Sequence, residues 1–291
     1  MEKKVLFSGE TASQDFDFSS AEVLELLKRK PIEFIGTATS DFQADPFTYD
    51  EDGKPLITND WEYELHKNLE GKESGIQIQQ VREELPNFFT HKQLYVKRSL
   101  EIGQNMFRFS LDFGRLCPKE GSFNRALMAE YVKVLAHIKA HGQEPMLTIY
   151  HWPMPCFLIK TANDGAIETG GWENPDVIKH FRFYVESVVN YLADETEIRR
   201  ALVEESFDKK FCDKIIAGGL VQYFISVNEP ESVLLPGYLA GVFPPYKKWR
   251  MDLIMKVLNR LVEAHDITFH AIKDSLWKMG NPSPKVGVAH A

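Results

Sequence analysis

Short apolar runs alternate along this chain with longer stretches in which apolar residues recur at every third or fourth position. The apolar runs lie at Phe34–Thr37, Met106–Phe109, Pro145–Tyr150, Val221–Val227 and Lys285–Ala289. Each run is apolar almost throughout, which is typical of strands buried on both faces of a sheet. Because helical patterns separate the runs, the order favours an α/β fold with a parallel sheet.

Periodicity and capping residues predict the helices between these strands. After Asn124, a residue type that caps helices, apolar residues at helical spacing lead to Gly142, where we expect the helix to end. Asn174 followed by Pro175 predicts a second cap and first turn. A third periodic stretch contains Ile254–Ile272 and ends before a glycine.

Two segments depart from the alternation of strands and helices, and the first, Ser19–Lys30, predicts a short helix ahead of the first strand. The second, Glu195–Ile215, is rich in charged residues and predicts a helical excursion packed outside the main body. His265 lies on the apolar face of the third helix, and we interpret it as a core histidine rather than a ligand.

Composition narrows the function classes. The 291 residues carry 34 Lys and Arg against 42 Asp and Glu, a net charge of −8 without long blocks of either sign, which argues against a nucleic-acid binder. The 12% aromatic content fits a carbohydrate site, although heavier core packing explains it equally simply. No stretch has the length and apolarity of a signal peptide or a membrane span.

The three cysteines, Cys117, Cys156 and Cys212, show no spacing typical of metal ligands or of a disulfide scaffold. We therefore expect a cytoplasmic protein with no metal and no organic cofactor.

The strongest chemical signal is Asn228-Glu229-Pro230 at the end of a predicted buried strand. A carboxyl group at the rim of an apolar sheet is favoured in its protonated form, as a general acid requires, and an adjacent amide can hold a ligand hydroxyl. The same three residues also fit an Asx turn that starts a loop.

Polar residues at other strands strengthen the catalytic interpretation. His151 and Trp152 follow the third strand, Arg108 lies within the second, and Gln43 follows the first. In a parallel α/β barrel the carboxyl ends of the strands form the active site, so these side chains are expected at one edge. The other interpretation of Arg108 is a salt bridge within the core.

At this point the sequence resembles the family 1 glycoside hydrolases, which are retaining β-glycosidases on a (β/α)8 TIM barrel. The matching segments, in family order, are Phe34–Ser40 with Gln43, Phe107–Leu111 with Arg115 and Pro118, Thr148–Trp152, Gly170–Asn174, Asn228–Pro230, and Gly237–Gly241 with Pro244 and Pro245. The resemblance extends from about Ile32 to Ala291.

The resemblance implies a role for each matched residue. Glu229 corresponds to the general acid/base and Asn228 to the amide that holds the sugar 2-hydroxyl. The residues expected to bind the glycon are Gln43, His151 and Trp152. Arg108 corresponds to the arginine that supports the catalytic nucleophile and keeps it ionised.

The chain departs from the family pattern at several positions. Pro153 replaces an acidic residue after His-Trp, Asp45-Pro46 replaces a Glu-Gly pair, and Phe113 replaces a tryptophan. The family nucleophile, a Glu in a Thr-Glu-Asn-Gly segment, has no counterpart, and no Glu follows Glu263.

The sequence therefore predicts an α/β fold of the TIM-barrel class, incomplete, with about the first five β/α units. We expect residues 1–291 to form one incomplete catalytic domain in which 1–30 is an amino-terminal extension. The expected function is hydrolysis of β-glucoside-like or β-galactoside-like substrates by the retaining route, with the nucleophile supplied by a missing carboxyl-terminal half or a second polypeptide. The chain alone is then expected to be inactive. The alternatives are another retaining hydrolase on the same barrel and a degenerate sugar-binding or scaffold protein without catalysis.

Overall fold

The computed structural model describes residues 34–40, 44–45, 48–49, 51–52, 54–69, 87–278 and 284–291. The chain divides into two compact units, Met1–Ile35 and Gly36–Ala291, and every described helix and strand belongs to the second. The expected amino-terminal extension, residues 1–30, and the short helix predicted within it lie outside the described residues.

Five parallel strands form the main sheet. Their spatial order is β1 (Gly36–Ala38), β4 (Met106–Ser110), β5 (Glu144–Tyr150), β8 (Tyr223–Asn228) and β9 (Lys285–Ala289). Because this order follows the chain, the sheet has the topology of successive β/α units of a barrel. All five strands predicted from the apolar runs are confirmed, with ends that shift by one or two residues.

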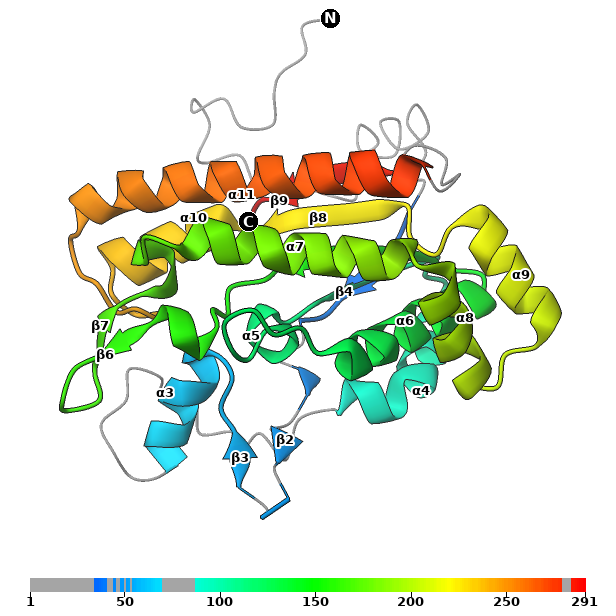
Figure 1. Cartoon of the computed structure of the whole chain (residues 1–291), viewed down its shortest axis with the longest axis horizontal. Helices are drawn as coiled ribbons and strands as arrows, with labels where there is room; N and C mark the ends of the chain where they lie inside the picture. Colours follow the sequence, from blue (N-terminus) through cyan, green and yellow to red (C-terminus); the bar gives the residue numbers. More distant parts are fainter. Residues whose placement is uncertain are drawn as a thin grey trace, which may run out of the picture. The chain divides into compact units, whose positions relative to one another are not determined.

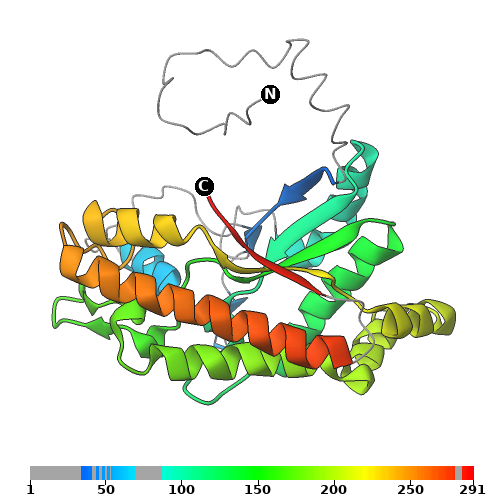
Figure 2. The same cartoon turned by 90° about the horizontal axis from the view of Figure 1, so that it is seen from above.

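Helices connect these strands and cover one side of the sheet. The longer helices are α4 (Phe88–Glu101), α6 (Arg125–Ala140), α7 (Val177–Ala193) and α11 (Met251–Lys278), and the shorter ones are α3 (Asp60–Leu69), α5 (Phe113–Leu116), α8 (Glu195–Glu204), α9 (Lys209–Gly218) and α10 (Pro230–Leu234). Figures 1 and 2 show α7 and α11 side by side along the sheet.

Short elements complete the described part of the chain. They are the strand pairs β2 (Thr48–Tyr49) with β3 (Pro55–Leu56) and β6 (Lys160–Thr161) with β7 (Ile167–Thr169), the 3-10 turns η2 (Cys156–Leu158) and η3 (Gly171–Glu173), and the π-helical turn η4 (Leu235–Leu239).

The two faces of the main sheet differ in burial. Phe109, Leu147 and Phe224 lie in one row across three strands and are at most 2% exposed. Arg108 and Met146 lie in register with each other on the opposite face, and both are partly exposed. Met106, Ser110 and Thr148 on this second face are buried, so the expectation of strands buried on both faces holds for the first face and for part of the second. In a closed barrel the second face is the interior, which the side chains of all eight strands fill together.

The predicted residues mark both ends of α6, whereas the start of α7 differs from the prediction. The Asn124 side chain accepts a hydrogen bond from the backbone N–H of Leu127, and α6 is followed by Gly142 with a φ of 78°, as predicted. Helix α7, however, begins at Val177 rather than next to Asn174. Asn174 ends η3, its Nδ2 donates to the carbonyl of Leu158, and its Oδ1 accepts from the N–H of Asp176 over 2.9 Å, so its side chain caps the turn that precedes α7 rather than the first turn of α7 itself.

The predicted excursion at Glu195–Ile215 is confirmed as α8 and α9. Asp194 and Asp208 cap the two helices through their side chains. Glu205, after α8, lies 2.7 Å from His137 Nε2 on α6 and links the excursion to the main body.

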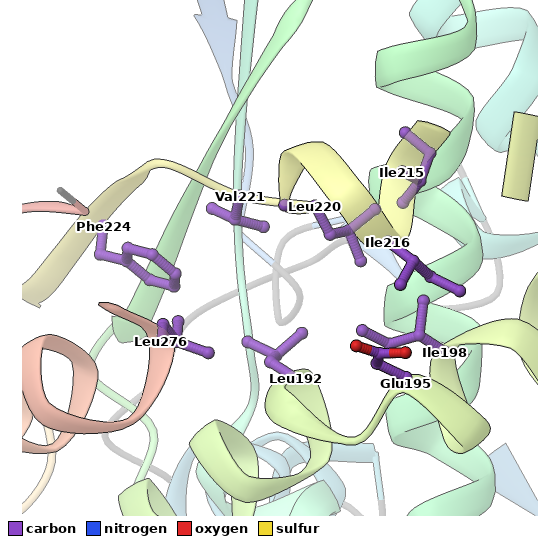
Figure 3. A pocket seen from close by; sticks show the side chains of 10 residues that line it. Leu192, Glu195, Ile198, Ile215, Ile216, Leu220, Val221, Phe224 and Leu276 are labelled. Atoms are coloured by element: carbon purple, nitrogen blue, oxygen red, sulfur yellow. The ribbon is translucent and has the colours of Figure 1, made fainter. Parts of the chain in front are cut away.

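An apolar pocket lies between this excursion and the sheet. Its lining residues are Leu192, Glu195, Ile198, Ile215, Ile216, Gly219, Leu220, Val221, Phe224 and Leu276, and Figure 3 shows Glu195 as the single acidic side chain among them. The pocket lies near the amino end of β8, whereas Asn228 is at the carboxyl end, so it is separate from the polar residues described below.

We predict that Leu135→Ala destabilises the fold strongly, because Leu135 of α6 is fully buried in the core. Loss of the side chain should lower the free energy of unfolding by about 2–5 kcal/mol. Leu94→Ala on α4, where the leucine is 42% exposed, is the matched control and should change it by less than about 0.5 kcal/mol. Urea unfolding of the three proteins measures the difference, and equal effects would contradict the described core.

Candidate active site

The carboxyl ends of β4, β5 and β8 bring the predicted polar residues together. Arg108 lies in β4, His151 directly follows β5, and Asn228 is the last residue of β8. Hydrogen bonds connect all three, as the prediction of a common edge requires. Gln43, predicted for the same edge, lies outside the described residues.

The amide of Asn228 is the centre of this network. Its Oδ1 accepts a hydrogen bond from Arg108 Nη2, and its Nδ2 donates to His151 Nε2 over 2.9 Å. Arg108 Nε donates to Thr148 Oγ1 over 2.8 Å. Asn228 is only 1% exposed, so both ends of the amide are fixed by protein partners.

These bonds determine the state of His151. Nε2 accepts from the Asn228 amide, so the ring proton belongs on Nδ1, which lies 3.1 Å from Ser110 Oγ. Burial, and then the positive charge of Arg108, lower the pKa of His151 to about 3. The ring is therefore neutral at physiological pH.

Trp152 joins this network to a group of aromatic rings. Its indole Nε1 donates to the carbonyl of Asn228 over 3.1 Å. Trp61 stacks on it with ring centroids 6.0 Å apart, and Phe243 lies at 5.7 Å. The three rings form an apolar cluster next to the hydrogen-bonding groups, and such a combination suits a ligand that has both hydroxyls and C–H faces.

Gly170 and Gly171 allow neighbouring side chains to pack closely near the segment that carries Trp152. Trp172 Nε1 donates to the hydroxyl of Tyr150, which in turn donates to the carbonyl of Trp152. A Cβ at Gly170 would lie 2.6 Å from a carbon of Pro245, and one at Gly171 would meet Met154 at similar distance. Only glycine therefore fits at these two positions.

Glu229 has a left-handed backbone, with φ 45° and ψ 67°, between β8 and α10. Its N–H donates to the carbonyl of Ala289 in β9, and its Oε2 accepts from Ser232 Oγ over 3.0 Å. Pro230 then occupies the first turn of α10. Glu229 is partly exposed, directly follows Asn228 in the chain, and interacts electrostatically with Arg108 of the same group.

The start of α3 holds the loop that follows Trp152. The N–H of Asp60 donates to the carbonyl of Met154 over 2.9 Å, and Asp60 Oδ1 accepts from the N–H of Met154 over 2.8 Å. Cys156 donates from its N–H to the carbonyl of Thr58. Burial raises the pKa of the Asp60 carboxyl from its usual 3.8 to about 8, although hydrogen bonds from Met154 and Trp61 oppose the shift.

The sequence analysis missed several of these residues. Ser110 and Thr148 lie on strands that already carried predicted residues, and two-residue periodicity places Ser110 on the same face as Arg108. Asp60, Trp61 and Phe243 come from distant segments, and no local pattern indicates them.

The described residues hold neither a metal-binding cluster nor a membrane-spanning helix. In that part of the chain, no three His, Cys, Asp or Glu side chains are grouped so that they would hold a metal ion. Likewise, no described helix is both long and apolar enough to span a membrane.

The fold and the site together define a parallel β/α-barrel architecture with its polar site at the carboxyl ends of the strands. Residues 28–211, more than half of the chain, match the sequence profile of Glycosyl hydrolase family 1. The chain belongs to this family, as its motifs predicted.

Individual relatives agree with this assignment. The chain is 27% identical over 177 residues to mouse Klotho and 27% identical over 194 residues to the aryl-phospho-beta-D-glucosidase BglC of Bacillus subtilis (strain 168). These matches cover 60% and 66% of this chain but only 14% and 32% of the relatives. The family 1 β-glucosidase of Thermotoga maritima has a TM-score of 0.65 at 20% identity, over 89% of this chain and 48% of that structure. The chain thus spans about half the length of that enzyme, and the predicted incomplete barrel is confirmed.

We predict that Asp60→Asn removes a pH dependence from the stability of the chain. Because the pKa of Asp60 is about 8 when folded and 3.8 when exposed, the folded chain keeps a proton that the unfolded chain releases between these values. The free energy of unfolding should therefore fall as pH rises from about 4 to about 8. The slope of this free energy against pH corresponds to at most one proton, which the folded chain binds and the unfolded chain does not. Asn keeps the Oδ1 acceptor and cannot ionise, so this slope should disappear.

Urea unfolding at a series of pH values measures the slope. Asp266→Asn is the control, since Asp266 is 69% exposed on α11, and it should keep the wild-type slope. The same slope in Asp60→Asn as in the wild type would contradict the assignment.

Proposed function

We propose that this chain carries the acid/base half of the active site of a retaining β-glycosidase. The observation that carries the proposal is the hydrogen-bonded group of Arg108, Asn228 and His151 directly beside Glu229. Family membership, shown by the match over residues 28–211, supports it for Arg108 and His151, and the Asn228-Glu229-Pro230 motif follows that region in family order.

In the proposed reaction, Glu229 protonates the glycosidic oxygen and later removes a proton from the attacking water. The Asn228 amide has a second N–H, which would bind the sugar 2-hydroxyl while the first remains on His151. His151, Trp152 and Gln43 would bind the glycon. A neutral histidine suits this task, because it can bind hydroxyls without adding charge to the site.

The nucleophile is proposed to come from outside this sequence, from a further segment of the same protein or from a second polypeptide. The retaining route needs two carboxyl groups about 5–5.5 Å apart. No described carboxylate forms an ion pair with Arg108, the residue proposed to support the nucleophile. The same observation favours a second candidate, sugar binding without catalysis. A cytoplasmic setting is also proposed, supported by three free cysteines.

We expect the isolated chain to show no turnover of a chromogenic β-glucoside, because the attacking carboxylate is missing. Release of the chromophore measures this directly, with Glu229→Ala and Glu231→Ala as a matched pair two residues apart. Turnover that Glu229→Ala abolishes and Glu231→Ala does not would show that this chain holds its own nucleophile. Turnover that survives in Glu229→Ala would contradict the role of Glu229.

We further expect the isolated chain to bind methyl β-glucoside. His151→Ala should weaken this binding about 10-fold, because it removes a hydroxyl-binding group and leaves the Asn228 amide without its partner. Tryptophan fluorescence measures binding, since Trp152 lies in the site. His270→Ala on α11, where the histidine is 63% exposed, is the control. Equal affinities in the two variants would contradict the proposed glycon site.

A further inference from the structure

Tyr150, the last residue of β5, carries a buried hydroxyl group that bonds to two partners. Trp172 Nε1 donates to this hydroxyl over 2.7 Å, since an indole nitrogen can only donate. The single proton of the hydroxyl therefore goes to the carbonyl of Trp152, over 2.5 Å. Burial raises the pKa of Tyr150 well above its usual value of 10, so this proton stays in place at physiological pH.

The backbone that receives this proton has an unfavourable conformation. Trp152 has a φ of 83°, in the left-handed region that residues other than glycine rarely adopt. Pro153 follows it, and the residue before a proline is restricted to extended conformations. A conformation of this kind persists only where neighbouring groups hold it.

The Tyr150 hydroxyl is placed to hold this backbone. In the described part of the chain it is the hydrogen-bond partner of the Trp152 carbonyl, and no backbone group bonds to the backbone of Trp152. The other contacts of Trp152 involve its indole, which donates to the carbonyl of Asn228 and stacks on Trp61. These ring contacts depend on the direction in which the backbone points the side chain. Relaxation of Trp152 to an extended conformation would therefore break them.

We propose that Tyr150 is a positioning residue, whose hydroxyl holds Trp152 in the left-handed conformation and so directs the side chains of His151 and Trp152 into the candidate active site. His151 is included because one peptide unit joins it to Trp152 and the two rings lie 5.2 Å apart. The contact of these side chains with a glycon rests on the proposed function, whereas the conformational role of Tyr150 does not.

The test compares Tyr150→Phe with Tyr184→Phe. The Tyr184 hydroxyl is likewise buried, and it donates to a backbone carbonyl, that of Ile149 in β5, over 2.6 Å. Each variant removes one buried hydroxyl and leaves one carbonyl of this segment without its partner, so both should lower the melting temperature. Only Tyr150→Phe should release Trp152.

Hydrogen exchange of the Trp152 indole N–H, assigned by NMR with Trp152→Phe, measures this release without any sugar. In Tyr150→Phe the exchange should be at least about 10-fold faster than in the wild type, because the bond to Asn228 opens when the backbone relaxes. In Tyr184→Phe it should stay within about 2-fold of the wild type. Wild-type exchange in a folded Tyr150→Phe, or equal acceleration in both variants, would overturn the proposal.

A second background keeps the test decisive if Tyr150→Phe does not fold. Glycine adopts a positive φ without strain, so in a Trp152→Gly chain the Tyr150 hydroxyl has less strain to oppose. Tyr150→Phe should then lower the melting temperature at most about half as much as it does in the wild type. An equal loss in both backgrounds, including failure of both proteins to fold, would contradict the role of the hydroxyl.

Binding of methyl β-glucoside separates the positioning role from the proposed function. Tyr150→Phe should weaken this binding about 10-fold and Tyr184→Phe less than about 2-fold. Unchanged binding in a Tyr150→Phe chain whose Trp152 is released would overturn the role of Tyr150 in the site. A wild-type chain that binds no methyl β-glucoside, although its Trp152 exchange responds as expected, would contradict the proposed glycon site and support the positioning role.

Discussion

The site depends above all on the buried amide of Asn228. One end of the amide accepts from a charged guanidinium and the other donates to a neutral imidazole. Reversing the amide would place its N–H groups against Arg108 and its oxygen against the lone pair of His151 Nε2, so both contacts would become repulsive. Strands β4, β5 and β8 are therefore connected in one arrangement at their carboxyl ends, and Glu229 is positioned by the residue that precedes it.

This constraint requires a rigid sheet beneath it. The helix-covered face of the sheet carries a buried row across β4, β5 and β8. Its members are Phe109, Leu147 and Phe224, and all are at most 2% exposed. On the loop side, Trp152 is held by Tyr150 and Asn228, while the backbone of Met154 is bonded to Asp60. The hydrophobic face and the loop contacts thus fix the polar groups from two directions.

Most of the sheet and much of the site could be predicted from the sequence, for physical reasons that differ by element. Apolar runs identify strands because burial on the helix-covered face requires them, and Asn228 and Glu229 are adjacent to such a run. The start of α7 was predicted too early, because the Asn174 side chain accepts from the N–H of Asp176 in the turn before the helix, and α7 itself begins at Val177. Trp61 and Asp60 could not be found, since their importance depends on contacts with Trp152 and Met154, more than ninety positions away.

One face of the sheet contributes to stability through helix packing, and the other face carries the polar residues of the site. Helix packing buries one face within the described residues, so the strands keep their order whatever occupies the other face. The second face carries Arg108, whose charge reaches both His151 and Glu229. Burial and that charge together lower the pKa of His151, so the neutral imidazole can serve as a hydroxyl-binding group. Among the described residues that form this group, the ionisable side chains next to the neutral His151 are Arg108 and Glu229. This arrangement suits recognition of an uncharged polyol next to the acid Glu229. The neutral Asn228 amide and His151 imidazole can form hydrogen bonds with hydroxyl groups without a change of charge.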